Sequence, residues 1–366
     1  MATQALSRLL PRDHAPWFTL PALEGTPTYK FDTAAGRHIV MLFFGSARFE
    51  PSQEALALIA RHRALFDDEK ACFFGMTVDP EDVAEKRIAQ QLPGIRFLLD
   101  YRREVSTLYG SAEAENYRPR WVLLDPALRV IDVLPLEQGE AAIALLRERL
   151  AAAEAELRWA PVLVVPDVIE PALCKRLVDL YESSGGTESG FMREVDGKTV
   201  EILDPSHKRR RDCQIEDEKL QLALRARLVR RLTPALERAF QFKPTRIERY
   251  IVACYEAEAG HFRPHRDNTT KGTAHRKFAV TINLNGGYEG GDLRFPEFGA
   301  RTYRAPPGGA VVFSCSLLHE ATPVTEGRRF AFLPFLYDED GAAVREANNA
   351  FLGDGIGAYR REGSAS

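Results

Sequence analysis

The stretch Cys254-Tyr-Glu-Ala-Glu-Ala-Gly-His-Phe-Arg-Pro-His-Arg-Asp267 holds a histidine and a carboxylate two residues apart, His265 and Asp267. Apolar and aromatic residues before and within it, Tyr250-Ile-Val252 and Phe262, favour a β-strand over a helix. Residues two apart on a strand point to the same face of the sheet. We therefore expect the imidazole of His265 and the carboxylate of Asp267 to converge.

A second histidine, His319, lies between two apolar stretches that are typical of strands, Gly309–Phe313 and Arg329–Phe335. Two histidines and one carboxylate on neighbouring strands form a facial triad, which leaves three positions of a six-coordinate iron(II) open. Open positions indicate catalysis rather than a structural role. The sequence therefore predicts a catalytic iron(II) site with His265, Asp267 and His319 as the metal ligands.

Two adjacent arginines, Arg328 and Arg329, follow His319 along the chain. Because successive strand residues face opposite sides of a sheet, only one of the two can face the inside of a barrel. A permanently charged guanidinium fork near an iron suits a dicarboxylate. We expect the inward arginine to bind such a co-substrate.

In this order and spacing, the motifs resemble the prolyl 4-hydroxylase-like branch of the iron(II)/2-oxoglutarate dioxygenases. The matching segments are Tyr255, His265-x-Asp267, Phe278–Asn285, Tyr288–Phe295, Pro307–Phe313 and His319-x3-Pro323-Val324-x2-Gly327-x-Arg329. The resemblance implies a double-stranded β-helix (jelly-roll) dioxygenase domain with flanking helices over residues 160–340. It also implies iron(II), 2-oxoglutarate and ascorbate, the last as a reductant, and makes Arg329 the partner of the far carboxylate of 2-oxoglutarate.

Two further residues are candidates for binding 2-oxoglutarate. The family uses a tyrosine ten residues before the first ligand histidine, and Tyr255 has this spacing; an ordinary strand tyrosine is the alternative. Asn283 stands where the hypoxia-sensing prolyl hydroxylases carry a second co-substrate tyrosine. That departure from the family pattern leaves the contact of Asn283 with 2-oxoglutarate open.

Asp267 also bears on the reaction that the resemblance implies. Halogenating relatives lack the acid at this position so that halide can bind, and the aspartate therefore favours hydroxylation. The family implies hydroxylation of a C–H bond in a prolyl or other peptidyl residue, with release of succinate and CO2. The alternatives are a small-molecule hydroxylase of the same mechanism and a non-catalytic sensor that binds iron and 2-oxoglutarate. The sequence leaves the substrate and the oligomeric state open.

The first part of the chain alternates strands and helices from Asp13 onward, as an α/β layer does. We expect strands at 38–44, 71–78, 96–99, 121–124 and 129–134, and helices at 52–66, after Pro80 and at 139–157. With 366 residues, 45% of them hydrophobic, the chain suits two domains better than one. The segment Arg158-Trp-Ala-Pro161 breaks the last of these helices, so we expect a first domain over residues 13–155.

His14–Pro21, the β-α-β order and Tyr117-Arg118-Pro119 before a strand resemble the thioredoxin fold in its peroxiredoxin-like form. That family carries a peroxidatic cysteine at the start of the first long helix, near Phe49–Glu54. The segment contains no cysteine. The domain is therefore expected to serve in docking, in substrate presentation or as a structural partner rather than in peroxide reduction.

Composition limits the partners and the location. The 49 basic and 52 acidic residues nearly balance at a net charge of -3, so neither nucleic acid nor a membrane is expected as the main partner. No apolar run approaches the ~20 residues that span a bilayer. The five cysteines are few and form no C-x-x-C pair, which favours reduced thiols and a cytoplasmic location.

Three further polar features have plainer interpretations. His261 is a rival for the first metal ligand, but no acid follows it by two residues. His275 falls in the polar segment Lys271–Lys277 and is expected to be solvated. The basic run His207–Asp212 is expected to form a solvated loop, with a grip on an acidic peptide or another anionic substrate as the alternative.

Overall fold

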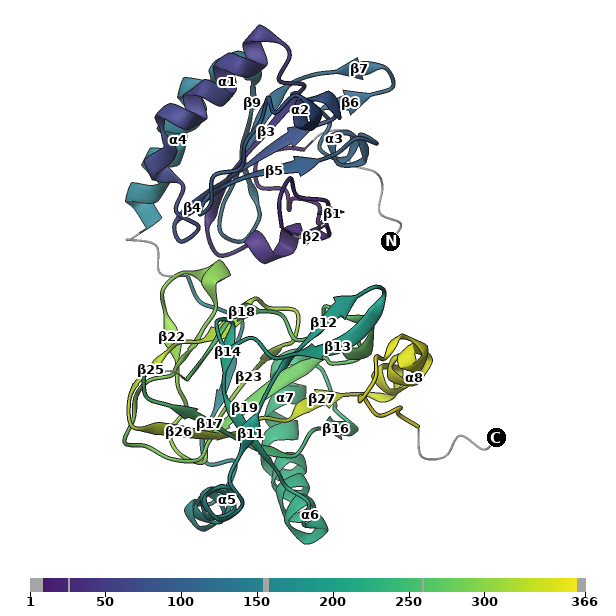
Figure 1. Cartoon of the computed structure of the whole chain (residues 1–366). Coiled ribbons are helices and arrows are strands. Elements are labelled where there is room, and N and C mark those ends of the chain that lie inside the picture. Colours follow the sequence, from purple (N-terminus) through teal and green to yellow (C-terminus); the bar gives the residue numbers. More distant parts are fainter. Residues whose placement is uncertain (1–8, 26, 154–157, 259, 361–366) are drawn as a thin grey trace. The chain divides into compact units, whose positions relative to one another are not determined.

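The computed structural model describes residues 9–25, 27–153, 158–258 and 260–360. By its internal contacts the chain divides into two compact units. The first comprises the chain up to Trp159 together with Pro296–Ala300, and the second comprises the remainder. Figure 1 shows both units with their elements labelled. The domain limits 13–155 and 160–340 stay predictions.

The first unit is built on a five-stranded sheet in the order β5-β4-β3-β8-β9. Strand β4 runs parallel to β3 and β5, whereas β8 is antiparallel to β3 and β9. Every residue of β3 and β4 is buried, as unbroken apolar runs predict for strands covered on both faces. The strands are β3 (His38–Gly45), β4 (Ala71–Thr77), β5 (Ile95–Leu99), β8 (Arg120–Leu124) and β9 (Val130–Pro135).

Two helices, α1 (Glu50–Arg61) and α4 (Gly139–Ala153), lie together on one face of this sheet (Figure 1). Their apolar sides, which include Leu58 and Ile143, share one buried core with Leu42 of β3. The arrangement confirms the predicted thioredoxin-like α/β fold. The short elements are β1 (Thr19–Leu20), β2 (Tyr29–Lys30), α2 (Glu81–Ala84), α3 (Glu104–Leu108), β6 (Ala112–Glu113) and β7 (Asn116–Tyr117).

Two helix limits differ from the expectation. Helix α1 begins at Glu50 rather than at residue 52, because a proline in the first turn, here Pro51, is compatible with helix geometry. It ends at Arg61, where a short 3-10 turn, Arg63–Leu65, follows. The expected extension of α4 through residues 154–157 lies outside the described residues.

The start of α1 presents no thiol. Ser52 is buried, and its hydroxyl donates to the carbonyl oxygen of Phe44 at 2.9 Å, which ties the helix to β3. Glu50 stands in the first turn, where the helix N-terminus favours a carboxylate. Cys72 lies in β4 without exposed surface, and burial raises the pKa of its thiol to about 12. A thiol in this state does not supply the thiolate that attacks peroxide.

We therefore expect the protein not to reduce hydrogen peroxide catalytically. With a thiol reductant present, peroxide loss with the full chain should equal the loss without protein, because the start of α1 holds no cysteine and the thiol of Cys72 is buried with a raised pKa. The measurement is peroxide concentration against time, with Cys72→Ser as the matched variant. Catalytic peroxide loss that Cys72→Ser abolishes would contradict this expectation.

The second unit contains two antiparallel sheets. The larger has the order β10-β23-β19-β26-β17-β15-β11, with β16 and β27 joined to it. Its strands are β10 (Leu163–Val165), β11 (Thr187–Glu188), β15 (Arg211–Gln214), β16 (Arg246–Glu248), β17 (Ile251–Glu256), β19 (Phe278–Asn283), β23 (Ala310–Ser314), β26 (Arg328–Phe332) and β27 (Phe335–Tyr337).

The smaller sheet has the order β14-β18-β24-β21-β22. Its strands are β14 (Lys208–Arg209), β18 (His261–His265), β21 (Leu293–Arg294), β22 (Thr302–Tyr303) and β24 (His319–Ala321). A separate two-stranded pair is formed by β20 (Glu289–Gly290) and β25 (Val324–Glu326).

Residues of β17 alternate between the two faces of the larger sheet. Ala253 and Tyr255 point inward and share a buried cluster with Phe262 of the smaller sheet. Val252 and Cys254 point outward and belong to the cluster that the helices cover. The two sheets therefore face each other across an apolar interior, which confirms the predicted jelly-roll domain.

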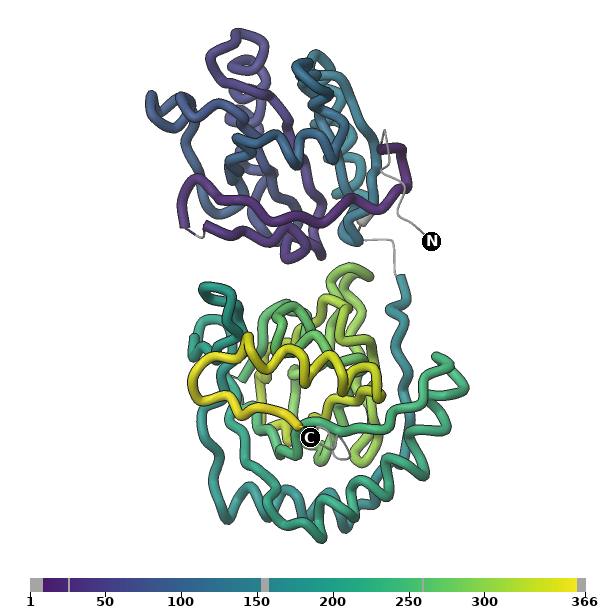
Figure 2. The backbone as a smooth tube through the Cα atoms, turned by 90° about the vertical axis from the view of Figure 1, so that its right-hand side faces the viewer, coloured from purple at the N-terminus to yellow at the C-terminus, as the bar shows by residue number. Residues whose placement is uncertain are grey.

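Helices cover the outer face of the larger sheet. They are α5 (Pro171–Ser184), α6 (Glu218–Arg227) and α7 (Thr233–Phe240), and a π-helical turn, Leu228–Leu232, joins the last two. Figure 2 shows them in teal and green, running along the outside of this unit. The chain also forms the hairpin β12 (Phe191–Val195) and β13 (Lys198–Ile202) and the helix α8 (Glu339–Ala347). Among the described residues, no helix combines the length and the apolar character needed to cross a membrane.

Two expectations for polar residues are wrong. The basic run His207–Asp212 is not a solvated loop, because it supplies β14 and the start of β15, and Lys208 and Arg210 are only 6% and 7% exposed. His275 is buried rather than solvated, since its Nε2 lies 2.5 Å from Oε2 of Glu248, which provides a polar partner inside the fold. All five cysteines are free and buried.

Candidate active site

Strand pairing brings the three candidate metal ligands together. His265 ends β18 and stands directly opposite His319, the first residue of β24. Asp267 follows two residues after β18, and its two carboxylate oxygens lie 3.6 Å from His265 Nε2 and 3.3 Å from His319 Nε2. The three ligand atoms all lie within 4.8 Å of one another, as a single metal ion requires.

Backbone carbonyl groups orient both imidazoles. Nδ1 of His265 lies 2.8 Å from the carbonyl oxygen of Arg263, and Nδ1 of His319 lies 3.0 Å from that of Leu317. In each ring Nδ1–H therefore donates, and the lone pair of Nε2 is left for a metal. The ring of Phe262 stacks on His265 with centroids 3.4 Å apart, which fixes the plane of that imidazole.

The protonation states suit metal binding. Burial, together with the neighbouring His319, lowers the pKa of His265 to about 4. Burial alone would raise the pKa of Asp267, but His319 and His265 outweigh it and hold the pKa well below its usual range. At neutral pH His265 is neutral and Asp267 is ionised, which is the state in which these groups bind a metal. Two imidazole nitrogens and one carboxylate oxygen fit iron(II).

Arg329 faces the cavity that contains the triad. The cavity measures about 50 Å³, and both Arg329 and Tyr255 line it. These two residues are direct partners on β26 and β17, and the Arg329 guanidinium carbon lies 5.2 Å from the centre of the tyrosine ring. Arg328 points the other way, is exposed and pairs with Glu182 at 2.6 Å. Strand alternation thus turns Arg329 inward and Arg328 outward, as predicted.

Asn283 lies behind Arg329. Its side chain is 3% exposed, and its amide Nδ2 donates to the carbonyl oxygen of Ala305 at 2.6 Å. Its Oδ1 accepts a hydrogen bond of 3.4 Å from Nε of Arg329. Asn283 is not among the residues that line the cavity. Asn283 thus contacts the guanidinium of Arg329, and its direct contact with 2-oxoglutarate stays a prediction.

Residues 250–337 match the family model of the 2OG-Fe(II) oxygenase superfamily, and this segment includes the triad, Tyr255 and Arg329. The second unit therefore carries a 2OG-Fe(II) oxygenase domain. Iron(II) and 2-oxoglutarate are the cofactors of this family, and the observed triad fits the iron.

Known proteins resemble both parts of the chain. A PKHD-type hydroxylase from Synechococcus sp. (strain JA-2-3B'a(2-13)) is 30% identical over 108 residues, which cover 26% of this chain and 48% of the relative. The chain thus spans about half the length of the curated relatives it matches. A prolyl-4-hydroxylase structure from Pseudomonas putida is similar at 17% identity and a TM-score of 0.37, covering 51% of this chain and 98% of the other.

The first unit has its own relatives. Residues 11–133 match the family model of the AhpC/TSA family. The structure of Mycobacterium tuberculosis AhpC is similar at 22% identity and a TM-score of 0.33, covering 40% of this chain and 94% of the other. The oxygenase domain is thus joined to a peroxiredoxin-like domain.

Two arginines that the sequence interpretation missed also line the cavity of the oxygenase domain. Arg210 is bound by Asp212 through two hydrogen bonds of 2.7 and 2.6 Å, and its Nη1 lies 3.5 Å from the hydroxyl of Tyr255. A signal was present, because Lys208, Arg210 and Asp212 are spaced by two, the period of a strand with one face buried. Arg249, just before β17, had no such signal.

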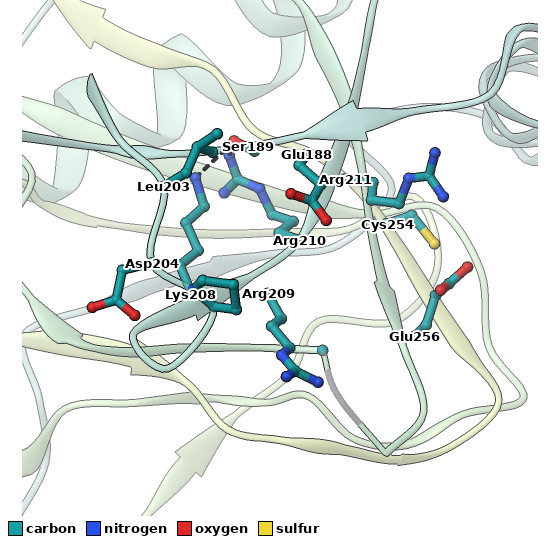
Figure 3. A pocket seen from close by; sticks show the side chains of 12 residues that line it. Glu188, Ser189, Leu203, Asp204, Lys208, Arg209, Arg210, Arg211, Cys254 and Glu256 are labelled. Atoms are coloured by element: carbon teal, nitrogen blue, oxygen red, sulfur yellow. Dashed lines mark hydrogen bonds between the residues drawn. The ribbon is translucent and has the colours of Figure 1, made fainter.

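A larger pocket of about 280 Å³ adjoins the basic run, and Arg210 lines both spaces. Figure 3 shows the side chains of Lys208 and Arg210 reaching towards Ser189. Lys208 donates a hydrogen bond of 2.7 Å to the hydroxyl oxygen of Ser189, and Arg210 donates one of 3.2 Å to the same atom. Arg209 points away from this group (Figure 3). The buried members of the run therefore hold the edge of the oxygenase domain together.

A second buried network supports Asp267. Glu248 accepts hydrogen bonds from Arg276 at 2.7 and 3.1 Å and contacts His275. Arg276 Nη1 also donates to the backbone carbonyl oxygen of Asp267 at 3.3 Å. His275, expected to be solvated, thus belongs to the structure that holds the carboxylate ligand in place.

We expect the purified protein to bind about one iron(II) per chain through the triad. Loss of a group that only supports a metal ligand typically lowers metal affinity about 10- to 100-fold. His265→Ala or His319→Ala should lower the affinity for iron by at least that much, because each removes a ligand itself and leaves two. The measurement is iron bound after equilibrium dialysis, and His261→Ala is the control. His261 lies on the same strand but outside the triad, so its removal should leave binding largely intact. Full iron occupancy in either triad variant would disprove this assignment.

Proposed function

We propose that this protein is an iron(II)- and 2-oxoglutarate-dependent hydroxylase that acts on a C–H bond of a prolyl or other peptidyl residue. The observation that carries the proposal is one cavity lined by His265, Asp267, His319 and the inward guanidinium of Arg329. Hydroxylation agrees with the name of the PKHD-type relatives. The peptidyl substrate follows from the resemblance to the prolyl 4-hydroxylase-like branch.

The protein residues hold the reactants in place. His265, Asp267 and His319 would hold the iron(II) through two imidazole nitrogens and one carboxylate oxygen, a ligand set that leaves positions free for reactants. When bound, iron(II) and 2-oxoglutarate supply the chemistry by which O2 is split: one oxygen atom enters the C–H bond, the other enters succinate, and CO2 is released. Arg329 would pair with the far carboxylate of 2-oxoglutarate, and Tyr255 is its direct partner on the neighbouring strand.

The surroundings of Arg329 strengthen this pairing. The guanidinium is buried, and the amide of Asn283 holds its Nε side. In a site that excludes water, a charge-assisted hydrogen bond is worth more than at the surface. Apolar cavity residues such as Leu293, Phe313 and Leu333 exclude water from the reacting groups.

Three finer points belong to the proposal. Ascorbate re-reduces the iron, as the resemblance implies. The enzyme works in the cytoplasm, which the five free thiols support. The peroxiredoxin-like domain docks or presents a protein substrate, since it retains the fold and lacks the thiol at the start of α1.

The test of the function is succinate release. With iron(II), ascorbate and oxygen, the full chain should convert 2-oxoglutarate to succinate slowly alone and several-fold faster with a substrate peptide. Asp267→Ala should abolish both rates, because the triad is incomplete. Stimulation by small molecules only would favour the small-molecule hydroxylase, and iron binding without any succinate would favour the sensor.

The assignment of Arg329 has its own test. Arg329→Ala should raise the 2-oxoglutarate concentration for half-maximal turnover by about tenfold or more, because a charge-assisted bond worth roughly 1.5–3 kcal/mol is lost. Iron affinity should change far less. Arg328→Ala is the matched control, since its guanidinium faces solvent and Glu182. Equal shifts for the two variants, or the reverse order, would show that the wrong arginine was assigned.

A further inference from the structure

Arg249 is a second cation on the wall of the triad cavity. It lies in the short break between β16 and β17, and its guanidinium carbon is 4.4 Å from the centre of the Phe335 ring, which also lines the cavity. Its Nε and Nη2 both donate to the backbone carbonyl oxygen of Leu333, at 3.0 and 2.9 Å. These contacts hold the guanidinium at the cavity without neutralising its charge.

Among the described residues, Arg249 differs from its neighbours in having no carboxylate partner. Arg210 is paired with Asp212, and Arg276 is paired with Glu248. Within the part of the chain that the structure describes, Arg249 donates hydrogen bonds to the carbonyl group of Leu333 and packs on the ring of Phe335, and neither partner carries a negative charge. Burial, followed by the positive charge of Arg210, lowers its pKa to about 10. A cation in this position is stabilised by an anion that enters the cavity.

The backbone at Arg249 is strained. Its φ angle is +72°, in the left-handed region that side chains other than glycine rarely adopt. Such a conformation costs free energy and persists only where the surrounding structure holds it, as it often does at ligand-binding sites. The left-handed backbone and the absence of a carboxylate partner are independent observations on one residue, and the second of them points to an anionic ligand.

Arg249 and Arg329 come from opposite ends of the same inner face. Arg329 stands opposite Tyr255, near the last residue of β17, whereas Arg249 precedes the first. In the proposed function Arg329 is occupied by 2-oxoglutarate. Arg249 is therefore available for a different anion.

The charges of the cavity indicate one further negative group. Asp212 neutralises Arg210, and once bound, the two positive charges of iron(II) would balance the two negative charges of 2-oxoglutarate. Asp267 offsets one of the two remaining guanidinium groups, those of Arg249 and Arg329. One positive charge is left over when both cofactors are bound.

We propose that Arg249 binds a carboxylate of the substrate, so that the enzyme selects a substrate with a carboxylate close to the C–H bond it hydroxylates. This inference rests on the proposed function and specifies its substrate class. The carboxylate can belong to an acidic residue of a peptide or to a small carboxylic acid, and the experiment below separates the two.

The first experiment uses two pools of random hexapeptides, amidated at the C-terminus, that differ only in one fixed residue, glutamate or glutamine. Succinate release by the full chain is measured above its substrate-free rate. The glutamate pool should stimulate wild-type turnover at least about tenfold more than the glutamine pool. A matched set of small carboxylic acids and their amides is tested beside them, and a preference confined to that set assigns the carboxylate to a small molecule.

The second experiment measures binding without turnover. The most active probe and its amide counterpart are titrated by calorimetry into the full chain loaded with manganese(II) and 2-oxoglutarate. Wild type should bind the carboxylate at least about tenfold more tightly, and Arg249→Gln should bind the two equally. Arg249→Lys keeps the charge and should retain part of the preference. Arg246→Gln is the matched control, because this arginine pairs with Glu339 outside the cavity and its loss should leave the preference unchanged.

The outcomes separate this inference from the proposed function. Absence of succinate with every probe and without probe would disprove the hydroxylase itself. Succinate release without a carboxylate preference, or with a preference that Arg249→Gln retains, would disprove only the role of Arg249. The role of Arg249 in substrate binding would also be disproved if Arg249→Gln raised the 2-oxoglutarate requirement more than Arg329→Ala did. Arg249 would then bind the co-substrate.

Discussion

The antiparallel pairing of β18 with β24 is the contact on which the candidate site depends. It sets His265 opposite His319 and places Asp267 just past the end of β18, so that three ligand atoms from distant parts of the sequence converge. The pairing is irregular between Phe262 and His265. Such irregularities locally re-aim side chains, and here His265 turns its Nε2 towards the carboxylate.

The larger sheet contributes the second constraint, the alternation of side chains along β17 and β26. The apolar side chains on one face pack against the helices, whereas Tyr255 and Arg329 on the other face line the cavity. A register shift by one residue would exchange Arg329 for Arg328 and place an apolar residue in water. The burial of the helix-facing residues therefore fixes which arginine enters the cavity.

Much of the fold and of the candidate site could be predicted from the sequence, because local residue patterns and the spacing between motif residues indicated them. The inward turn of Arg329 follows from the two-residue period of strands. His265 and Asp267 converge as predicted, although β18 ends at His265 and Asp267 lies in the turn that follows rather than on the strand. The predictions for His275 and for the run His207–Asp212 failed, because burial of a charged side chain depends on partners that spacing does not reveal. Glu248, for example, lies 27 residues from His275. Arg249 was missed because a left-handed backbone at an arginine has no sequence signal.

The cavity concentrates positive charge at a cost to folding. Removing one partner of a buried ion pair typically costs about 3–5 kcal/mol, which shows how unfavourable an unpaired buried charge is. Asp212 and Glu248 remove that penalty for Arg210 and Arg276, whereas no carboxylate among the described residues does so for the buried Arg329 or for Arg249, which is half-buried. That they stand unpaired beside the triad argues that anionic ligands, rather than the fold, require them.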